Sequence, residues 1–167
     1  MHRSSLRGRT LLRSVPCGGA MIEFALVMPF LVGLAVGLFD LGFGLWQSMQ
    51  VRAAAEAGAQ YAALHPDPWD AAKIAAVGAA VTGATGASGI SATPAPSQVC
   101  GCTNNGAFTP VGSPTGGSCG SFACSPSGTP GLYASVSAQM PYSPLVPWPW
   151  AKQPPAALTG QAYRRLK

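Results

Sequence analysis

The apolar residues of this chain are gathered into one long run near its N-terminal end. No residue from Phe24 to Phe39 carries a charge, although Glu23 stands directly before this stretch. The apolar character persists to Trp46. A helix needs about 20 predominantly apolar residues to span a bilayer. The run therefore predicts a transmembrane helix over residues 19–46. A cleaved signal peptide is the alternative, but its apolar part covers only about 7–15 residues and ends at a small-residue cleavage site.

An alanine-rich helical segment, residues 47–89, is expected to continue the helix out of the membrane. Alanine is the best helix former, and Arg52 with Glu56 offers one i, i+4 pair. The stretch from His65 to Pro68 breaks this helix. A second helix is expected to start there, with Asp67 as its N-cap, Pro68 as its first residue and Asp70 three residues after the cap. One stripe of the second helix is apolar or small: Ile74, Val77, Gly78 and Val81. Since no charged face opposes that stripe, it is expected to pack on the chain's own sheet or on a neighbouring subunit.

Glycine, proline and serine dominate the remaining region, residues 90–167, where short strands joined by turns are expected. The stretch Leu132–Met140 alternates like a strand and puts five residues on one face: Leu132, Ala134, Val136, Ala138 and Met140. Pro141 and the prolines after it end any ladder. The predicted fold class is α+β, with one transmembrane helix, an Ala-rich continuation, a second short helix and a small β-rich, loop-rich exported region.

Three aromatic residues follow the predicted strand in a proline-rich run: Tyr142, Trp148 and Trp150. They are expected either to cap a small core or to contact a membrane surface or a partner. The core is the preferred interpretation, because a small domain is short of buried area and single apolar surface residues are common.

The distribution of charge predicts the topology. Only 9% of the residues are charged, against roughly 25% in an ordinary soluble domain. Before the apolar run stand four basic residues and no acid: Arg3, Arg7, Arg9 and Arg13. Only Arg52 follows the run closely, so the N-terminus is expected in the cytoplasm and the chain from about Gln47 onward outside it. Because the net charge of +5 belongs mostly to residues 1–18, it does not indicate nucleic-acid binding.

Within the predicted span, four residues fall on one helical face: Gly33, Gly37, Asp40 and Gly44. Small residues on one stripe let another helix approach closely, and Gly33-x-x-x-Gly37 is the minimal form of such a contact. The alternative is that Asp40 reaches toward the outer headgroups and the glycines are ordinary residues of a membrane helix.

Glu23 is an acidic residue just inside the start of the apolar run. A carboxylate at the centre of a bilayer costs about 2.5–3.5 kcal/mol on insertion scales, so an acid there indicates a function. Its natural partner is a positive group at the same depth. The α-amine produced by a cut between Gly18 and Gly19 is one candidate.

This order of features resembles the processing site of type IV prepilins: a basic leader, a glycine, four small or apolar residues, a glutamate and a membrane helix. The sequence from Gly19 to Val27 is similar to the TadE-like pseudopilins of the tight-adherence (Flp) pilus system, as are the Asp-Leu-Gly phrase at Asp40 and the Ala-rich helix up to Ala63. The family's basic residue near Phe43 is absent. The resemblance implies that a prepilin peptidase removes the leader, residues 1–18, after Gly18.

The same resemblance assigns Glu23 and Phe24 to subunit register and assembly. It implies a single-pass protein of the bacterial inner membrane, with a periplasmic C-terminal region that stays in the assembly platform or enters the extracellular pilus. The expected partners are the membrane, the prepilin peptidase, other pilins or pseudopilins and the pilus assembly platform.

Four cysteines lie in the exported region: Cys100, Cys102, Cys119 and Cys124. An even number in an oxidising compartment predicts two disulfides. A bond between Cys100 and Cys102 would be strained, which leaves two connectivities, and the nested one, Cys100 with Cys124, is preferred. A zinc site is the alternative, but C-x-C and C-x₄-C spacings fit it poorly. Cys17 belongs to the leader, and the order of its surroundings does not fit a lipoprotein.

The chain offers little material for catalysis. Beyond the predicted span it has three acidic residues and one histidine: Glu56, Asp67, Asp70 and His65. We therefore expect no enzymatic activity, metal, cofactor, small-molecule substrate or nucleic acid. The preferred function is a minor pseudopilin or pilus assembly protein, and the alternative is a signal-anchored periplasmic binding module unrelated to pili. A thiol oxidoreductase is a weak third choice, since no C-x-x-C occurs.

Overall fold

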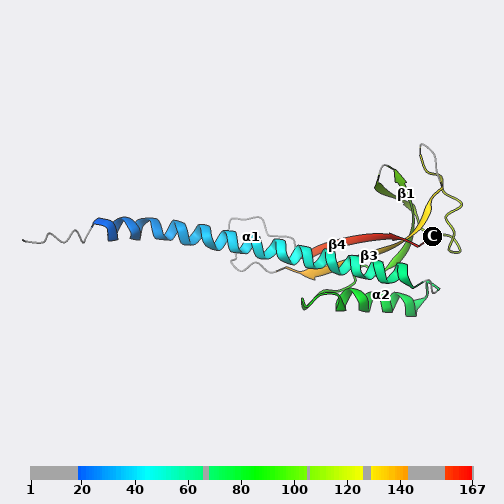
Figure 1. Cartoon of the computed structure of the whole chain (residues 1–167), viewed down its shortest axis with the longest axis horizontal. Coiled ribbons are helices and arrows are strands. Elements are labelled where there is room, and N and C mark those ends of the chain that lie inside the picture. Colours follow the sequence, from blue (N-terminus) through cyan, green and yellow to red (C-terminus); the bar gives the residue numbers. More distant parts are fainter. Residues whose placement is uncertain (1–18, 66–67, 105, 126–128, 143–156, 167) are drawn as a thin grey trace, which may run out of the picture. The chain divides into compact units, whose positions relative to one another are not determined.

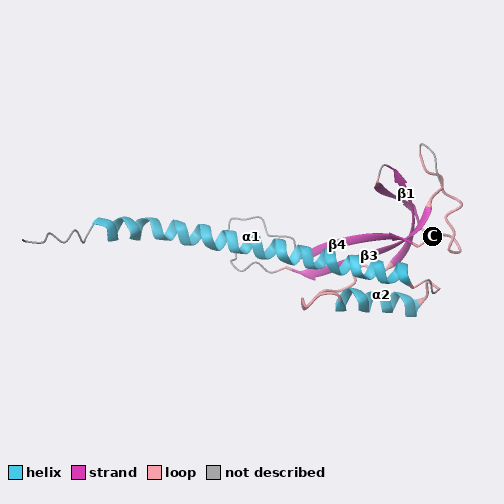
Figure 2. Ribbon diagram, in the orientation of Figure 1, coloured by secondary structure: helices cyan, strands magenta, loops and turns pink. Residues whose placement is uncertain are grey.

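The computed structural model describes residues 19–65, 68–104, 106–125, 129–142 and 157–166 (Figures 1 and 2). The helices and strands within these ranges are α1 (Gly19–Leu64), α2 (Ala71–Gly83), β1 (Ser97–Asn104), β2 (Ala107–Gly112), β3 (Gly131–Pro141) and β4 (Ala157–Arg165). The chain divides into two compact units, Met1–Phe39 and Asp40–Lys167. The predicted α+β class is confirmed.

The first part of α1 is an apolar helix with exposed sides. It is long and apolar enough to cross a membrane, and none of its most apolar stretch is buried within the protein. Pro29 lies inside the helix, which continues through it. Its exposed residues include large apolar side chains such as Phe30, at 81% exposure, and Leu34, at 62%. A helix that is hydrophobic all round and uncovered has the properties of a membrane span.

The four strands form one antiparallel sheet in the order β2-β1-β3-β4. β3 is a central strand, paired with β1 through Leu132 and Cys100 and with β4 through Val136 and Ala162. The predicted strand and its inward face are confirmed, because all five residues of that face are buried. β4 was not located by the sequence pattern, although it pairs with β3 along its whole length.

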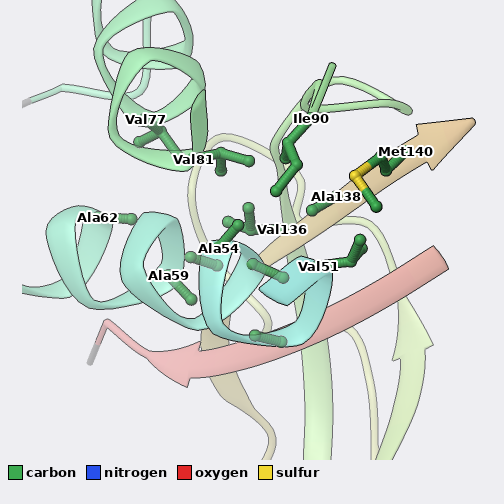
Figure 3. Packing of buried hydrophobic residues seen from close by; sticks show 13 residues of the cluster. Val51, Ala54, Ala59, Ala62, Val77, Val81, Ile90, Val136, Ala138 and Met140 are labelled. Carbon is green, nitrogen blue, oxygen red and sulfur yellow. The ribbon is translucent and has the colours of Figure 1, made fainter. Parts of the chain in front are cut away.

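The main core lies where α1 and α2 cover β3 (Figure 3). Its α1 residues are mostly alanines, whereas α2 contributes Val77 and Val81, and β3 contributes Val136 and Met140. Within α2 the deeply buried positions are Lys73, Val77 and Val81, while Ile74 and Gly78 of the predicted stripe are half-buried. α2 therefore packs within its own subunit, which was one of the two expected alternatives.

Two glycines let the backbone of α1 approach its neighbours closely. A Cβ at Gly58 would lie 2.5 Å from a methyl group of Val81 and 3.0 Å from one of Val136. A Cβ at Gly160 of β4 would lie 3.0 Å from the backbone of Arg52. No larger residue fits at either position without displacing α2, β3 or α1.

α2 begins later than the sequence pattern suggested. Its N-cap is Asp70, whose carboxylate accepts a hydrogen bond of 2.8 Å from the backbone N–H of Lys73. The expectation that Asp67 is the cap and Pro68 the first helical residue is therefore wrong. Pro68 is instead the acceptor of a backbone bond from Asp70, which turns the chain before the helix starts.

The face of the sheet opposite the core carries a small aromatic cluster. The ring of Phe108 lies over Gly101, where a Cβ would overlap it, and its centroid is 4.7 Å from that of Tyr133 and 4.4 Å from that of Tyr163. Aromatic pairs at such distances add roughly 0.5–1.5 kcal/mol beyond the area they bury. The cluster joins β2, β3 and β4 on the side that α1 does not cover.

Gly58→Ala is expected to lower the stability of the folded region. The added methyl group overlaps two β-branched side chains that have little rotamer freedom, so the cost should be about 1–3 kcal/mol. Thermal unfolding of the full chain in detergent, followed by the change in circular dichroism, measures it.

Gly78→Ala is the matched control for this variant. Its Cβ would meet only Ala92 at 3.8 Å, an ordinary contact, and alanine is favoured in a helix interior by roughly 0.5–1 kcal/mol. An unfolding temperature for Gly58→Ala equal to or above that of Gly78→Ala would contradict the packing described here.

Candidate functional site

The proposed cleavage site lies at the edge of the described residues. Helix α1 is described from Gly19, while Gly18 and the rest of the leader lie outside the described residues. Glu23 and Phe24 stand in the second turn and are both exposed. None of the described residues gives the Glu23 carboxylate a hydrogen bond or an ion pair. A group that neutralises Glu23 does not come from the described part of its own chain.

The four residues of the predicted intramembrane face have different surroundings. A Cβ added to Gly33 or Gly37 would meet no described atom within 4 Å beyond the helix itself. At Gly44 it would lie 3.2 Å from the phenol oxygen of Tyr142. The pKa of Tyr142 is raised, first by burial and second by the negative charge of Asp40. Asp40, Gly44 and Tyr142 are thus brought together, whereas Gly33 and Gly37 make no such contact.

The aromatic run after β3 is described only at its first residue. Tyr142 is half-buried against α1, while Trp148 and Trp150 lie outside the described residues. One of the three therefore packs on the fold.

Two disulfides staple the loop region, as predicted, but their connectivity differs from the preferred nested one. Cys100 is bonded to Cys119 and Cys102 to Cys124, over 19 and 22 residues. Cys119 lies with Cys100 and Leu132 in a small buried cluster. The chain then runs past Gly112, on which Phe122 packs, before Cys124 meets Cys102. The nested expectation is wrong because Cys119 and Cys124 meet Cys100 and Cys102 in the same chain order, whereas the nested pairing needs the reverse order.

A cluster at the junction of α1 and α2 was missed by the sequence analysis. Lys73 is only 5% exposed, and its ammonium group donates a hydrogen bond to the carbonyl of His65 and lies 5.6 Å from the ring centroid of Tyr61. The ring of His65 stacks on Tyr61 and contacts the Tyr61 carbonyl at 2.9 Å. Lysine near a helix C-terminus favours the exposed carbonyls there. The cluster therefore caps the end of α1.

A cavity of about 440 Å³ lies beside this cap, lined by residues that include His65, Trp69, Lys73, Gln98, Leu132 and Leu166. Within the described residues no group of three or more His, Cys, Asp or Glu side chains is close enough together to hold a metal ion. The expected Arg52–Glu56 ion pair is not formed, although both side chains are described and exposed.

The pairing of the cysteines can be tested by removing them two at a time in a Cys17→Ser background. Cys100→Ser with Cys119→Ser removes one whole disulfide, so the oxidised protein should contain no free thiol under denaturing conditions. Thiol titration measures this directly.

Cys100→Ser with Cys124→Ser breaks both bonds and should leave two reactive thiols, on Cys102 and Cys119. It should also lose more stability than the first variant, because each closed loop of this size contributes about 3 kcal/mol in the chain-entropy model. The opposite pattern of free thiols would support the nested connectivity.

Comparison with known proteins bears on the membrane-proximal part of the chain. Residues 18–60 match the model of the TadE-like protein family. No curated protein and no solved structure matches the chain. The match covers the start of α1, the apolar stretch and most of the alanine-rich part. This agrees with the resemblance found in the sequence: the segment from residue 18 to residue 60 is similar to the TadE-like family.

Proposed function

We propose that this chain is a minor pseudopilin that assists assembly of a tight-adherence (Flp) pilus or of a related secretion machine. A prepilin peptidase removes residues 1–18 on the cytoplasmic side of the inner membrane. Residues 19–46 remain as a single membrane span, and residues 47–89 and 90–167 form the periplasmic part. The protein acts by binding other pilins and the assembly platform, without catalysis.

The observation that carries the proposal is the family match, which begins at residue 18 and covers Glu23 and the apolar stretch. A peptidase that cuts between Gly18 and Gly19 leaves Gly19 as the first residue of the mature chain. The new α-amine then lies four residues from Glu23, at the same end of the span.

Glu23 has the role of an intersubunit anchor in this proposal. Its exposed carboxylate lacks a partner among the described residues, and an ionised acid near hydrocarbon needs one. The N-terminal amine of a neighbouring pilin supplies the opposite charge. A charge-assisted hydrogen bond of this kind is roughly twice as strong as a neutral one, and it fixes the axial register between subunits.

The intramembrane contact face of the proposal consists of Gly33, Gly37, Asp40 and Gly44, while Phe24 belongs with Glu23 to the register contact. Packing among the described residues makes no demand for glycine at positions 33 and 37, since a Cβ there would meet none of their atoms within 4 Å. That openness supports a contact with another helix. Asp40 and Gly44 lie at the outer end of this face, where Tyr142 already covers Gly44.

Glu23→Ala is expected to abolish surface fibres or to reduce them at least tenfold, a factor that corresponds to about 1.4 kcal/mol. The variant removes the carboxylate without disturbing the exported fold, whose core begins at Val51. Fibre counts by electron microscopy and co-purification of the major pilin measure the effect.

Glu56→Ala is the matched control, because Glu56 is an exposed glutamate of the same helix beyond the predicted span. It should leave fibres and co-purification unchanged. Wild-type fibres in cells that carry Glu23→Ala would contradict the anchor and would favour a signal-anchored module unrelated to pili.

A further inference from the structure

Strand β4 forms an edge of the sheet. It pairs with β3 on one side and with no described strand on the other. Such an edge presents a row of unpaired backbone N–H and C=O groups to an extended chain that approaches it. The opposite edge strand, β2, is six residues long and contains Pro110, and both features hinder pairing. β4 is nine residues long, and from Ala157 to Tyr163 it has neither a proline nor a charged residue. β4 is therefore the edge that is better suited to pairing.

The register of β4 shows which of its backbone groups point away from β3. The N–H of Leu166 donates a hydrogen bond of 2.8 Å to the carbonyl of Leu132, which continues the ladder of the two strands by one residue. Hydrogen-bonded and non-hydrogen-bonded positions alternate along an antiparallel pair. By this alternation Thr159, Gln161 and Tyr163 direct their backbone groups away from β3. No backbone hydrogen bond from another described segment reaches these outward groups.

A groove lies between this edge and the exposed side of α1. Its volume is about 420 Å³, and its lining residues are Arg52, Glu56, Thr159, Gly160 and Gln161. The helix and the strand are in close contact beside it, since a Cβ at Gly160 would lie 3.0 Å from the backbone of Arg52. The groove thus has the outward backbone groups of β4 on one side and a helix on the other.

The helix side of the groove carries one charge of each sign. Arg52 and Glu56 are both exposed, and neither forms an ion pair with another described residue. They are four residues apart on the helix, a separation of about 6 Å along its axis. Residues i and i+2 of a strand point to the same face and are about 6.7 Å apart. A strand that lies in the groove is therefore able to place an acid beside Arg52 and a base beside Glu56.

The order of these two charges along such a strand follows from its direction. Arg52 lies against Gly160, while Ala63, farther along α1, lines a cavity with Leu166, farther along β4. α1 and β4 thus run the same way, and Glu56 lies farther toward the C-terminal end of β4 than Arg52. The three strand pairings of this sheet are all antiparallel. A strand antiparallel to β4 passes Glu56 first and Arg52 second, so it needs a base and, two residues later, an acid.

We propose that the groove between α1 and β4 binds an extended segment of another protein, which adds a strand to the sheet beside β4. The segment is antiparallel to β4 and carries a basic residue two positions before an acidic one. Main-chain hydrogen bonds supply affinity in strand addition, and alternate side chains supply specificity. This chain has no acid and base two positions apart in either order, so a second copy does not supply the strand. The inference goes beyond the proposed function, since it concerns the folded unit alone and holds whether or not the partner is a pilin.

Two synthetic peptides of equal composition test the charges, with the full chain in detergent. The first is Thr-Val-Lys-Val-Asp-Val-Thr and the second is Thr-Val-Asp-Val-Lys-Val-Thr, each with blocked ends and a fluorescent label. Fluorescence anisotropy should show that the wild type binds the first peptide about tenfold more tightly, because the second brings like charges together. Arg52→Glu with Glu56→Arg exchanges the charges at two exposed positions and should reverse this preference. Any other pattern of preference, or no binding of either peptide, would overturn the inference.

Gln161→Pro tests the backbone contact. Proline removes an outward N–H of β4 and no bond to β3, so the fold should persist while the affinity for the first peptide falls about tenfold. Gln161→Ala is the matched control, because it loses the same side chain and keeps the N–H. Equal affinities of these two variants would overturn the inference. Wild-type dimers that Gln161→Pro dissociates, measured by light scattering, would place a second copy in the groove and overturn it as well. If Gln161→Pro does not fold, the exchange of charges decides.

Discussion

The fold depends on how closely α1 approaches the sheet and α2. Along the buried side of the helix stand Ala54, Ala55, Gly58, Ala59 and Ala62, and from the sheet Gly160 meets the helix backbone. The same helix is apolar and exposed before it reaches this region. The first half of this continuous helix is therefore suited to lipid, and its second half packs against the protein's own sheet.

Small residues at this contact limit the hydrophobic stabilisation it can supply. Burial contributes roughly 25 cal/mol per Å² of apolar area, and alanines bring little area each. The larger contributions come from Val77, Val81, Val136 and Met140, which surround the helix. The two disulfides and the aromatic cluster around Phe108 stabilise the part of the sheet that α1 does not reach. A small folded region of this kind is expected to need such additional stabilisation.

The sequence predicts those elements whose buried residues are large. β3 was found because Leu132, Val136 and Met140 alternate with polar residues. β4 was missed because its inward residues include Gly160 and Ala162, which are small since α1 lies against them. The close contact with α1 that positions β4 thus requires small inward residues, and the alternation of large apolar residues that would predict a strand is lost. The cysteine pairing could not be predicted for another reason: both connectivities close loops of similar length, and the entropy of closure depends only on the logarithm of that length.

The residues of the candidate site also fall into two groups: those that local sequence patterns predict, and those that only contacts between distant parts of the chain reveal. Glu23, Gly33 and Gly37 could be selected from helical spacing and composition alone, and the roles proposed for them concern contacts with other chains. The cover of Gly44 by Tyr142 joins residues far apart in the sequence, so helical spacing could not reveal it. The burial of Lys73 at the end of α1 is likewise a product of the fold.

Proteolytic creation of a new N-terminus beside Glu23 is the central claim. The most direct measurement is the intact mass of the membrane-extracted protein from cells with and without a co-expressed prepilin peptidase. The account predicts that the peptidase shortens the chain by its first 18 residues and leaves Gly19 at the N-terminus. A full-length mass in the presence of the active peptidase, under conditions where it processes a known prepilin, would contradict the account.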